Sequence, residues 1–224
     1  MSILIKNIHC IKALINRNPE KVILLKADSK KNSEIIALAE SKNIPVDLTM
    51  NGVSAICKEP PIKDIKSQGY ELGNIVLIMD EIQDTRNLGS CLRSASFFGV
   101  DSVIIPKNNS ADFTNPAVVE TSTGGVYDLD LYKAINIATL QEKLKENGYW
   151  ISGFSEHGAI PLEQTEFTEK NVLILGNEEK GIRKLVEKNC DQILKINKYG
   201  QTSSLNVAVA TAIALFEVQK KLRY

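Results

Sequence analysis

Val172-Leu173-Ile174-Leu175-Gly176-Asn177-Glu178 contains the pattern that decides the fold: a short aliphatic run followed at once by a turn of glycine and asparagine. The pattern occurs at three places, and we name the turns the first motif (87–93), the second motif (175–181) and the third motif (200–207). Runs rich in aliphatic residues precede them, and a helix-like stretch follows each one. Because ligands of open α/β sheets bind where strands end and such turns begin, the three loops are expected to converge on one crevice.

The chain around these motifs alternates between short apolar runs and longer amphipathic segments. The runs predict strands at 75–79, 101–105, 149–153, 172–175 and 192–196, and the segments predict helices at 88–98, 115–122, 137–147, 180–189 and 203–222. This order predicts an α/β domain whose parallel sheet has helices on both faces. The first half of the last helix is apolar on most sides, which is typical of a helix buried between a sheet and another surface, such as a partner subunit.

The N-terminal part predicts a second, smaller α/β domain. An apolar stripe at helical spacing runs through 1–16, and the following segments predict a strand (22–25), a helix (32–42), a strand (44–48) and a short helix (50–58). The stretch 58–69 is rich in proline, lysine and glycine, so a boundary is expected near 58–73. We place the small domain at 1–66, the linker at 67–73 and the large domain at 74–224.

Composition indicates a globular protein without a membrane segment. The chain has 224 residues, of which 43% are hydrophobic and 24% charged, and these proportions allow a large core without a disulfide or metal. No apolar run approaches the ~20 residues that cross a bilayer, and the N-terminal apolar stretch is too short for a signal peptide. We therefore expect a cytoplasmic protein.

The spacing of cysteine and histidine predicts no metal site. None of the cysteines forms a C-x-x-C pair, and the chain has two histidines. Reduced, mostly buried thiols are the expected state, and Cys91 in the first motif has no visible base partner for nucleophilic catalysis. The residues concerned are Cys10, Cys57, Cys91, Cys190, His9 and His157.

Charge is distributed unevenly although the formal net charge is zero. Residues 1–66 carry eleven Lys or Arg and seven Asp or Glu, a balance of +4, and the remainder carries sixteen and twenty, a balance of −4. A basic small domain beside an acidic large one is compatible with a small domain that meets phosphate. A scatter of solubilising surface charges explains the same numbers equally well.

The three motifs, in this order, closely resemble the signature motifs of the SpoU/TrmH family of RNA ribose 2′-O-methyltransferases. The resemblance runs from about residue 75 to about 219, and its most specific segment is Ser203-Ser204-Leu205-Asn206-Val207-Ala208-Val209-Ala210. Residues 7–15 are similar to the opening of the small RNA-binding domain of ribosomal RNA members. Among relatives, the chain resembles most the enzymes that methylate a guanosine ribose in 23S ribosomal RNA.

The resemblance implies a cofactor, partners and a set of site residues. It implies S-adenosylmethionine as cofactor, RNA as substrate, a homodimer, and a C-terminal part from about Leu173 that passes through a loop as a deep trefoil knot. The implied catalytic residues are Arg93, Asn87, Ser204, Asn206 and Glu178. The implied cofactor-binding residues are Leu175, Gly176, Asn177, Ile196, Lys198, Ser204 and Leu205.

Methyl transfer requires a ribose hydroxyl held in line with an activated methyl group, and proximity alone can supply ~7–11 kcal/mol. Arg93 lies one helical turn after Gly89, where free amides of residues 88–90 and the guanidinium are expected to bind a phosphate. Because guanidinium stays protonated to a pKa of about 12 or above, we expect Arg93 to orient the phosphate and stabilise the developing alkoxide rather than accept the proton. Arg86 is a further candidate for a phosphate contact.

Helix capping gives some of the same residues a structural role. Asn87 is expected to cap the helix of the first motif, and Ser203 or Ser204 the last helix. Glu178 would suit the start of the helix that follows the second motif.

Two departures from the family pattern bear on cofactor and substrate. Asn197-Lys198 stands where many relatives have Pro-Met, which makes this loop more adaptable, and Ser67-Gln68-Gly69 stands where a His-Gln-Gly element is frequent. The alternatives are a transfer RNA ribose methyltransferase, an enzyme for a ribosomal site that gives antibiotic resistance, and a catalytically silent RNA-binding or assembly protein. A nicotinamide-dependent dehydrogenase is disfavoured because no G-x-G-x-x-G follows the first strand of the large domain.

Overall fold

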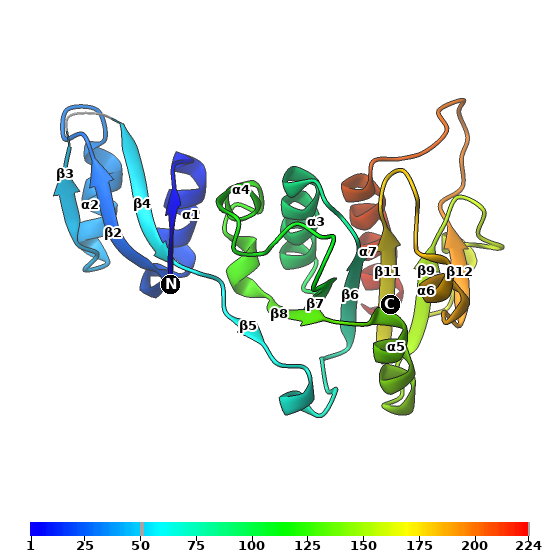
Figure 1. Ribbon diagram of the computed structural model, residues 1–224. Helices are drawn as coiled ribbons and strands as arrows, with labels where there is room; N and C mark the ends of the chain where they lie inside the picture. The colour runs from blue at the N-terminus through cyan, green and yellow to red at the C-terminus, as the bar shows by residue number, and fades with distance from the viewer. Residues whose placement is uncertain (50–51, 224) are drawn as a thin grey trace.

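The computed structural model describes residues 1–49 and 52–223, which form two sheets joined by one chain segment (Figure 1). The larger sheet has eight strands within the described residues, all parallel, in the order β10-β12-β9-β11-β6-β7-β8-β5. They are β5 (Ile62–Lys63), β6 (Ile75–Asp80), β7 (Ser102–Pro106), β8 (Asp130–Ala134), β9 (Trp150–Phe154), β10 (Ile160–Pro161), β11 (Asn171–Gly176) and β12 (Gln192–Lys195). The predicted parallel sheet is therefore confirmed.

Helices cover both faces of this sheet, as predicted. Ile75, Leu77 and Met79 of β6 point into a core shared with α3, α4 and α7, whereas Val76 and Ile78 point into a second core under α5 and α6. Burial on both sides explains why the central strand is a continuous aliphatic run. The helices are α3 (Thr85–Phe97), α4 (Pro116–Thr121), α5 (Ile137–Glu146), α6 (Lys184–Lys188) and α7 (Val207–Arg223).

Strand β8 was not predicted, and its sequence shows why. Asp-Leu-Tyr-Lys-Ala looks polar, but Leu131 and Tyr132 are buried, while the charged side chains are paired at the surface. Lys63 binds Asp130 at 2.6 Å, and Lys133 binds Asp112. Ile62, expected in the linker stretch, pairs with Leu131, so β5 belongs to the large sheet.

The smaller sheet has the order β1-β4-β2-β3. Two predictions here are wrong. Residues 2–5 form a strand, and the helix begins only at Ile8, where Asn7 caps it. The short helix expected at 50–58 is instead strand β4 from Val53, with Ala55 and Cys57 buried at the alternating spacing of a strand, and residues 50–51 lie outside the described part. The elements are β1 (Ser2–Ile5), α1 (Ile8–Arg17), β2 (Val22–Ala27), α2 (Ser33–Ser41), β3 (Val46–Leu48) and β4 (Val53–Lys58).

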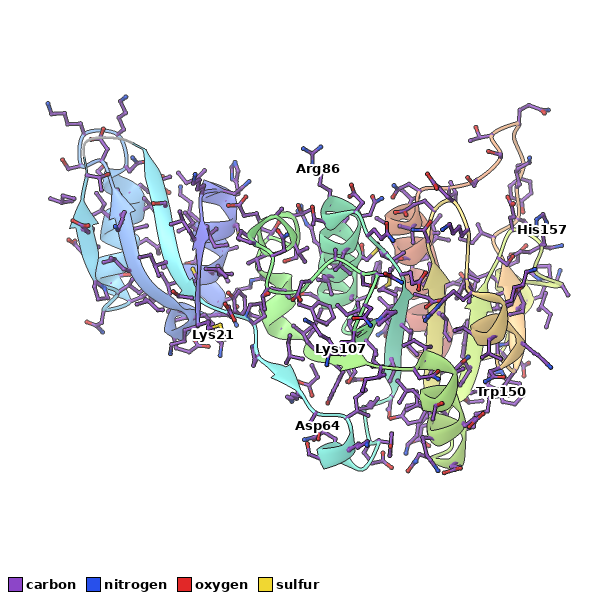
Figure 2. All side chains as sticks on the ribbon, viewed as in Figure 1. Lys21, Asp64, Arg86, Lys107, Trp150 and His157 are labelled. Atoms are coloured by element: carbon purple, nitrogen blue, oxygen red, sulfur yellow. The ribbon has the colours of Figure 1, made fainter. Side chains whose placement is uncertain are left out.

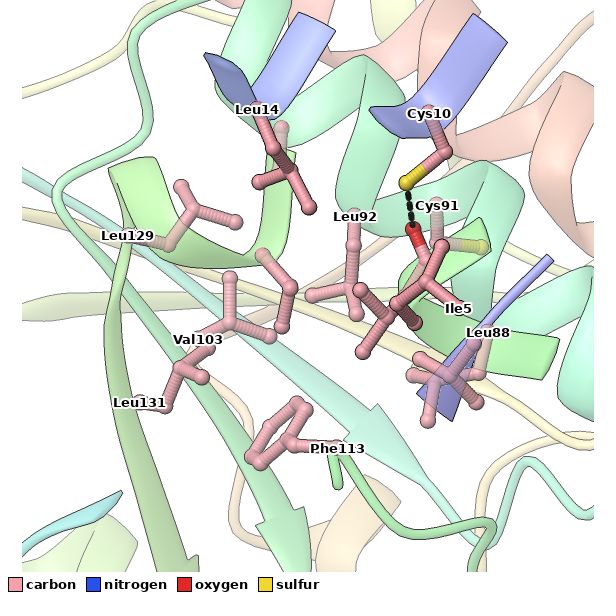
Figure 3. Packing of buried hydrophobic residues seen from close by; sticks show 14 of the residues in the cluster. Ile5, Cys10, Leu14, Leu88, Cys91, Leu92, Val103, Phe113, Leu129 and Leu131 are labelled. Carbon is pink, nitrogen blue, oxygen red and sulfur yellow. Dashed lines mark hydrogen bonds between the residues drawn. The ribbon is translucent and has the colours of Figure 1, made fainter. Parts of the chain in front are cut away.

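The two sheets share one hydrophobic core. Ile5, Cys10 and Leu14 of the N-terminal elements pack among Leu88 and other side chains of the larger unit (Figure 3). The Cys10 thiol donates a hydrogen bond to the Val119 carbonyl at 3.5 Å. Polar contacts surround this contact area: Arg17 binds Asp128 at 2.9 Å and the Thr123 carbonyl at 2.7 Å. The small unit therefore packs against α4 through a shared hydrophobic core and is not connected by a linker alone.

Candidate functional site

The structure brings the three motifs together at the carboxyl edge of the large sheet. Asn206 Nδ2 donates a hydrogen bond to Asn87 Oδ1 at 3.0 Å, and Asn87 Nδ2 donates in turn to Glu178 Oε1. Each of these residues comes from a different motif, and Asn87 lies 91 and 119 positions from its partners. Parallel strands present their carboxyl ends at one edge, which is why distant turns can meet there.

Helix α3 carries Asn87 in its first turn, but Asn87 does not cap it. The cap is Asp84, whose Oδ1 accepts the backbone N–H groups of Arg86 and Asn87 at 2.8 Å each. The helix therefore begins three residues earlier than predicted, and the Leu88 amide already donates to the Asp84 carbonyl at 3.0 Å. The amides of residues 88–90 lie inside the helix and are not free for phosphate, which corrects the expectation from sequence. Asn87 is left free to use its side chain in the site.

Arg93 and Arg86 are the exposed cations of α3. They are seven residues apart, which places them on the same face of the helix, roughly 10 Å apart along its axis. Neither guanidinium has a hydrogen bond or ion pair within residues 1–49 and 52–223, and Figure 2 shows Arg86 pointing away from the top of α3. Because the amides at the start of the helix are occupied, these two guanidinium groups are what α3 offers to an anion.

Gly89 has a structural explanation that differs from the expected one. A Cβ on this residue would lie 2.6 Å from Thr121 Cβ and 2.9 Å from the Val118 carbonyl. The space that the glycine leaves is therefore filled by α4 of the same chain.

The second motif is a tight turn closed on itself. Asn177 and Gly181 exchange two backbone hydrogen bonds, of 3.1 and 2.8 Å, and the Asn177 side chain donates to the Glu81 carbonyl at 3.1 Å. A Cβ on Gly176 would lie 2.1 Å from the Gly181 carbonyl carbon, so the turn itself requires this glycine. Helix α6 begins at Lys184 rather than at 180, because this turn occupies 177–181.

Asp80 and Arg183 lie at the edge of the site, and the sequence did not predict their role. Asp80 is fully buried at the end of β6, and its carboxylate accepts the Arg183 backbone N–H at 3.0 Å, Nε at 2.9 Å and Nη2 at 2.6 Å. The hydrogen bond to Asp80 raises the pKa of Arg183, and Glu81 binds the same guanidinium at 3.3 Å. The available signal was a carboxylate directly after five aliphatic residues, since a buried charge must be paired.

The third motif lies in a loop that precedes α7. The helix begins at Val207, and Asn206 Oδ1 accepts the Ala208 amide at 2.9 Å, so the expected capping by Ser203 or Ser204 is wrong. Ser204 is exposed and makes no hydrogen bond in the described part of the chain. The preceding loop is held at Asn197, which donates to Glu163.

Several features of this loop suit a nucleoside ligand. No backbone–backbone hydrogen bond involves 197–205 among the described residues, so these amides and carbonyls can bind the polar edge of an adenine. Leu205 is 47% exposed and offers an apolar contact to its face. Leu175 is buried at the end of β11, Ile196 is half-buried and Lys198 is exposed. The predicted cofactor residues thus fit such a ligand chemically.

The thiols are not placed for catalysis. Burial raises the pKa of Cys91 to about 12, and its Sγ lies 3.4 Å from Thr211 Oγ1 between α3 and α7. Across residues 1–49 and 52–223, no group of three His, Cys, Asp or Glu side chains could hold a metal ion. In the same part of the chain, no helix is long and apolar enough to cross a membrane.

Comparison with known proteins matches residues 74–216 to the SpoU rRNA Methylase family. Two relatives are named 23S rRNA (guanosine-2′-O-)-methyltransferase RlmB, from Pectobacterium atrosepticum and Escherichia coli K12. Each is 32% identical and the match covers 99% of both chains. The structure of the SpoU methyltransferase AviRb from Streptomyces viridochromogenes with AdoMet superposes with a TM-score of 0.83 at 21% identity, over 99% of this chain and 91% of that one. A putative TrmH-family RNA methyltransferase from Porphyromonas gingivalis gives a TM-score of 0.76 at 23% identity, over 98% and 90%.

Proposed function

Because this chain belongs to the SpoU rRNA methylase family, we propose that it transfers the methyl group of S-adenosylmethionine to the 2′-hydroxyl of a guanosine in 23S ribosomal RNA. The observation that carries the proposal is the hydrogen-bonded chain from Asn206 through Asn87 to Glu178, which joins the three motifs in one site. The relatives named for this reaction match almost the whole chain, including the small N-terminal unit.

The cofactor site lies between the turn of the second motif and the loop 196–205. Bound there, S-adenosylmethionine supplies a methyl group on a sulfonium, which is already an activated leaving group. Loop amides and carbonyls would bind the adenine, Leu205 would offer an apolar contact to its face, and Gly176 and Asn177 would hold the cofactor from the second motif. The residues that would hold it are Leu175, Gly176, Asn177, Ile196, Lys198, Ser204 and Leu205.

The RNA side of the site uses side chains of α3. Arg93 holds the phosphate beside the target ribose and stabilises negative charge on the 2′-oxygen as the hydroxyl loses its proton. Arg86 binds a second phosphate on the same helix face. Asn87 and Asn206, tied to each other and to Glu178, form a rigid polar surface that orients the ribose, with Ser204 beside them.

The C-terminal part, from about Leu173, forms a deep trefoil knot in our proposal. Support comes from the path of the chain, since β11 lies between β9 and β6 while α7 returns to pack on α3 and β11. We keep the domain bounds of 1–66 and 74–224, with the linker at 67–73, except that β5 within the first range pairs with β8 and belongs to the large sheet, and we assign the small domain to RNA binding. A substrate in 23S RNA places the protein in the cytoplasm.

We also propose a homodimer, which the exposed apolar side chains of α7 support. Val209, Ile213 and Phe216 follow Leu205 at spacings of four, four and three, so they form one stripe, and they are 37–56% exposed. Phe97 of α3 is 82% exposed, and its neighbour Phe98 packs against Phe216. Such a stripe supports an interface with a second copy of the chain.

The deciding experiment is ribose-methylation mapping of ribosomal RNA from cells with and without this gene. A single 2′-O-methyl guanosine in 23S RNA should disappear without the gene and return with the wild-type gene, but not with Arg93→Ala. Calorimetry should give one S-adenosylmethionine site per chain. Loss of a transfer RNA methyl group instead, or unchanged methylation everywhere, would contradict the proposal.

A further inference from the structure

A shallow slot of about 250 Å³ lies on the α5–α6 face of the sheet, outside the site described above. Its floor is formed by Ala138 and Val186, and its walls by Ile135, Asn136, Arg183 and Leu185. Ile135 and Leu185 are 87% and 60% exposed although both are large and aliphatic. Two such side chains facing one slot mark a surface that is suited to a flat apolar ligand.

The slot is held rigidly. Gln141 Nε2 of α5 donates to the Val186 carbonyl at 2.9 Å, and Asn189 Nδ2 donates to the Ala138 carbonyl at 3.4 Å. Helices α5 and α6 are therefore fixed to each other, and Figure 1 shows them side by side. The Arg183 guanidinium is fixed by Asp80 and Glu81, while its side chain remains 42% exposed.

The charge of the slot favours a nucleobase over a phosphate. The two carboxylates bound to Arg183 carry two negative charges against its single positive charge, so the guanidinium offers a flat stacking surface rather than a free cation for phosphate. Unpaired bases in RNA commonly stack on such guanidinium planes. Lys107 lies nearby (Figure 2): its backbone amide donates to the Ala134 carbonyl at 2.8 Å, directly before Ile135, and its exposed side chain has no hydrogen bond or ion pair within the described residues. Lys107 can bind the phosphate of the nucleotide whose base enters the slot.

The polar group of the slot favours guanine. Asn136 Oδ1 accepts the Thr139 amide at 3.2 Å as the cap of α5, and its Nδ2 has no partner in the described part of the chain. Asn136 therefore offers an unused amide donor to a ligand in the slot. Guanine carries two acceptors, O6 and N7, on one edge, whereas adenine carries a donor and an acceptor there.

The slot also lies close to the methylation site. Ile135 directly follows β8, at the same strand-end edge as the three motifs. Glu81 links the two places, because its side chain binds Arg183 while its carbonyl accepts the side chain of Asn177 in the second motif. We infer that the slot between Ile135, Arg183 and Leu185 binds an unstacked guanine base of the substrate RNA; this rests on the proposed function.

Two variants test this inference in the full-length protein. Asn136→Gly removes the side-chain donor while leaving a residue that is tolerated at a helix N-cap, and Leu185→Ala removes one wall. Each should weaken binding of a 23S RNA fragment by about 3- to 30-fold, as expected for one hydrogen bond or part of a stacked base, with unchanged S-adenosylmethionine affinity. Asn115→Gly is the matched control, because Asn115 is likewise an exposed asparagine that caps a helix, α4.

Substituted RNA identifies the base. Fragments carrying 7-deazaguanine, one guanosine at a time, should show one position at which the wild type loses affinity and Asn136→Gly does not lose any further. The position found in this way shows whether the bound base belongs to the methylated nucleotide or to a neighbouring one. Unchanged RNA binding by both variants, or a change in oligomer mass on Leu185→Asp, would overturn the slot while leaving methylation by the wild type intact. A wild type that neither binds nor methylates the fragment would overturn the proposed function as well.

Discussion

Replacing Gly176 by alanine tests whether the second motif works as a closed turn. The added Cβ would lie 2.1–2.3 Å from backbone atoms of Gly181 and Ile182, where ordinary contact begins at 3.4 Å. Backbone atoms cannot rotate away, so the turn must open by roughly 1 Å. Overpacking of this kind costs about 1–3 kcal/mol, and the reduced chain entropy of alanine in the unfolded state returns about 0.4–1 kcal/mol. We expect the upper end of the cost to apply, because the Asn177–Gly181 hydrogen bonds are strained together with the contact.

A net loss of about 2 kcal/mol corresponds to a melting temperature lower by about 4–8 °C in a chain of this length. We expect cofactor affinity to fall at least tenfold, because Glu178 and Asn177 move with the turn. Calorimetric melting and cofactor titration measure the two effects. Gly200→Ala is the control, since nothing lies within 4 Å of its added Cβ and its melting temperature should not fall. A Gly176→Ala protein that melts with the wild type and binds cofactor equally well would refute the reasoning.

Three further outcomes are expected. Arg93→Ala should lower single-turnover methylation by about 10²–10³, and Arg93→Lys should fail too because an ammonium cannot copy the planar fork, both with unchanged cofactor affinity; a wild-type rate in either would remove Arg93 from the mechanism. Light scattering at micromolar concentration should give about twice the 24.8 kDa chain mass, and Val209→Asp should give one chain mass; a wild-type monomer that methylates RNA would contradict the dimer. Burial raises the pKa of Cys10 and Cys91 from 9.0 to about 12, so the folded state keeps protons that the unfolded state releases. The free energy of unfolding should therefore fall as pH rises above 9. Denaturant midpoints measure this dependence, and the stability of Cys10→Ala should fall less steeply with pH than that of the wild type.

The parallel sheet could be predicted because its central strands are buried on both sides. Runs such as 75–79 and 172–175 have no polar face, and that pattern belongs to few structures. Strand β8 has charged residues at two of its five positions, and only the tertiary partners Lys63 and Asp112 show why they are tolerated. For strand β4 the sequence predicts a helix, because the short apolar run has no decisive period.

The meeting of the three motifs could be predicted from their place at strand ends, but the role of each residue could not. Capping depends on where a helix begins, and Asp84 and Asn87 are both good caps in sequence. The choice of Asp84 leaves the Asn87 side chain available to Glu178 and Asn206. Arg183 depends on a turn that folds it back onto Asp80, a contact across 103 positions that no local pattern contains.

The docking of the small unit limits how RNA binding can be studied. Leu14 is fully buried and lies against Gly124 of the larger unit, while Glu120 accepts the amides of Lys6 and Asn7 at 2.5 and 3.1 Å. Removing residues 1–66 would expose this apolar surface, remove the amides bound to Glu120 and the Arg17 partner of Asp128, and take β5 from the edge of the large sheet. A truncated protein would therefore lose stability and RNA affinity together, and the two losses could not be separated. Substitution of single exposed cations in the full-length chain, with the salt dependence of RNA binding as the readout, separates them, since each phosphate contact removed lowers the salt slope by about one and leaves the fold unchanged.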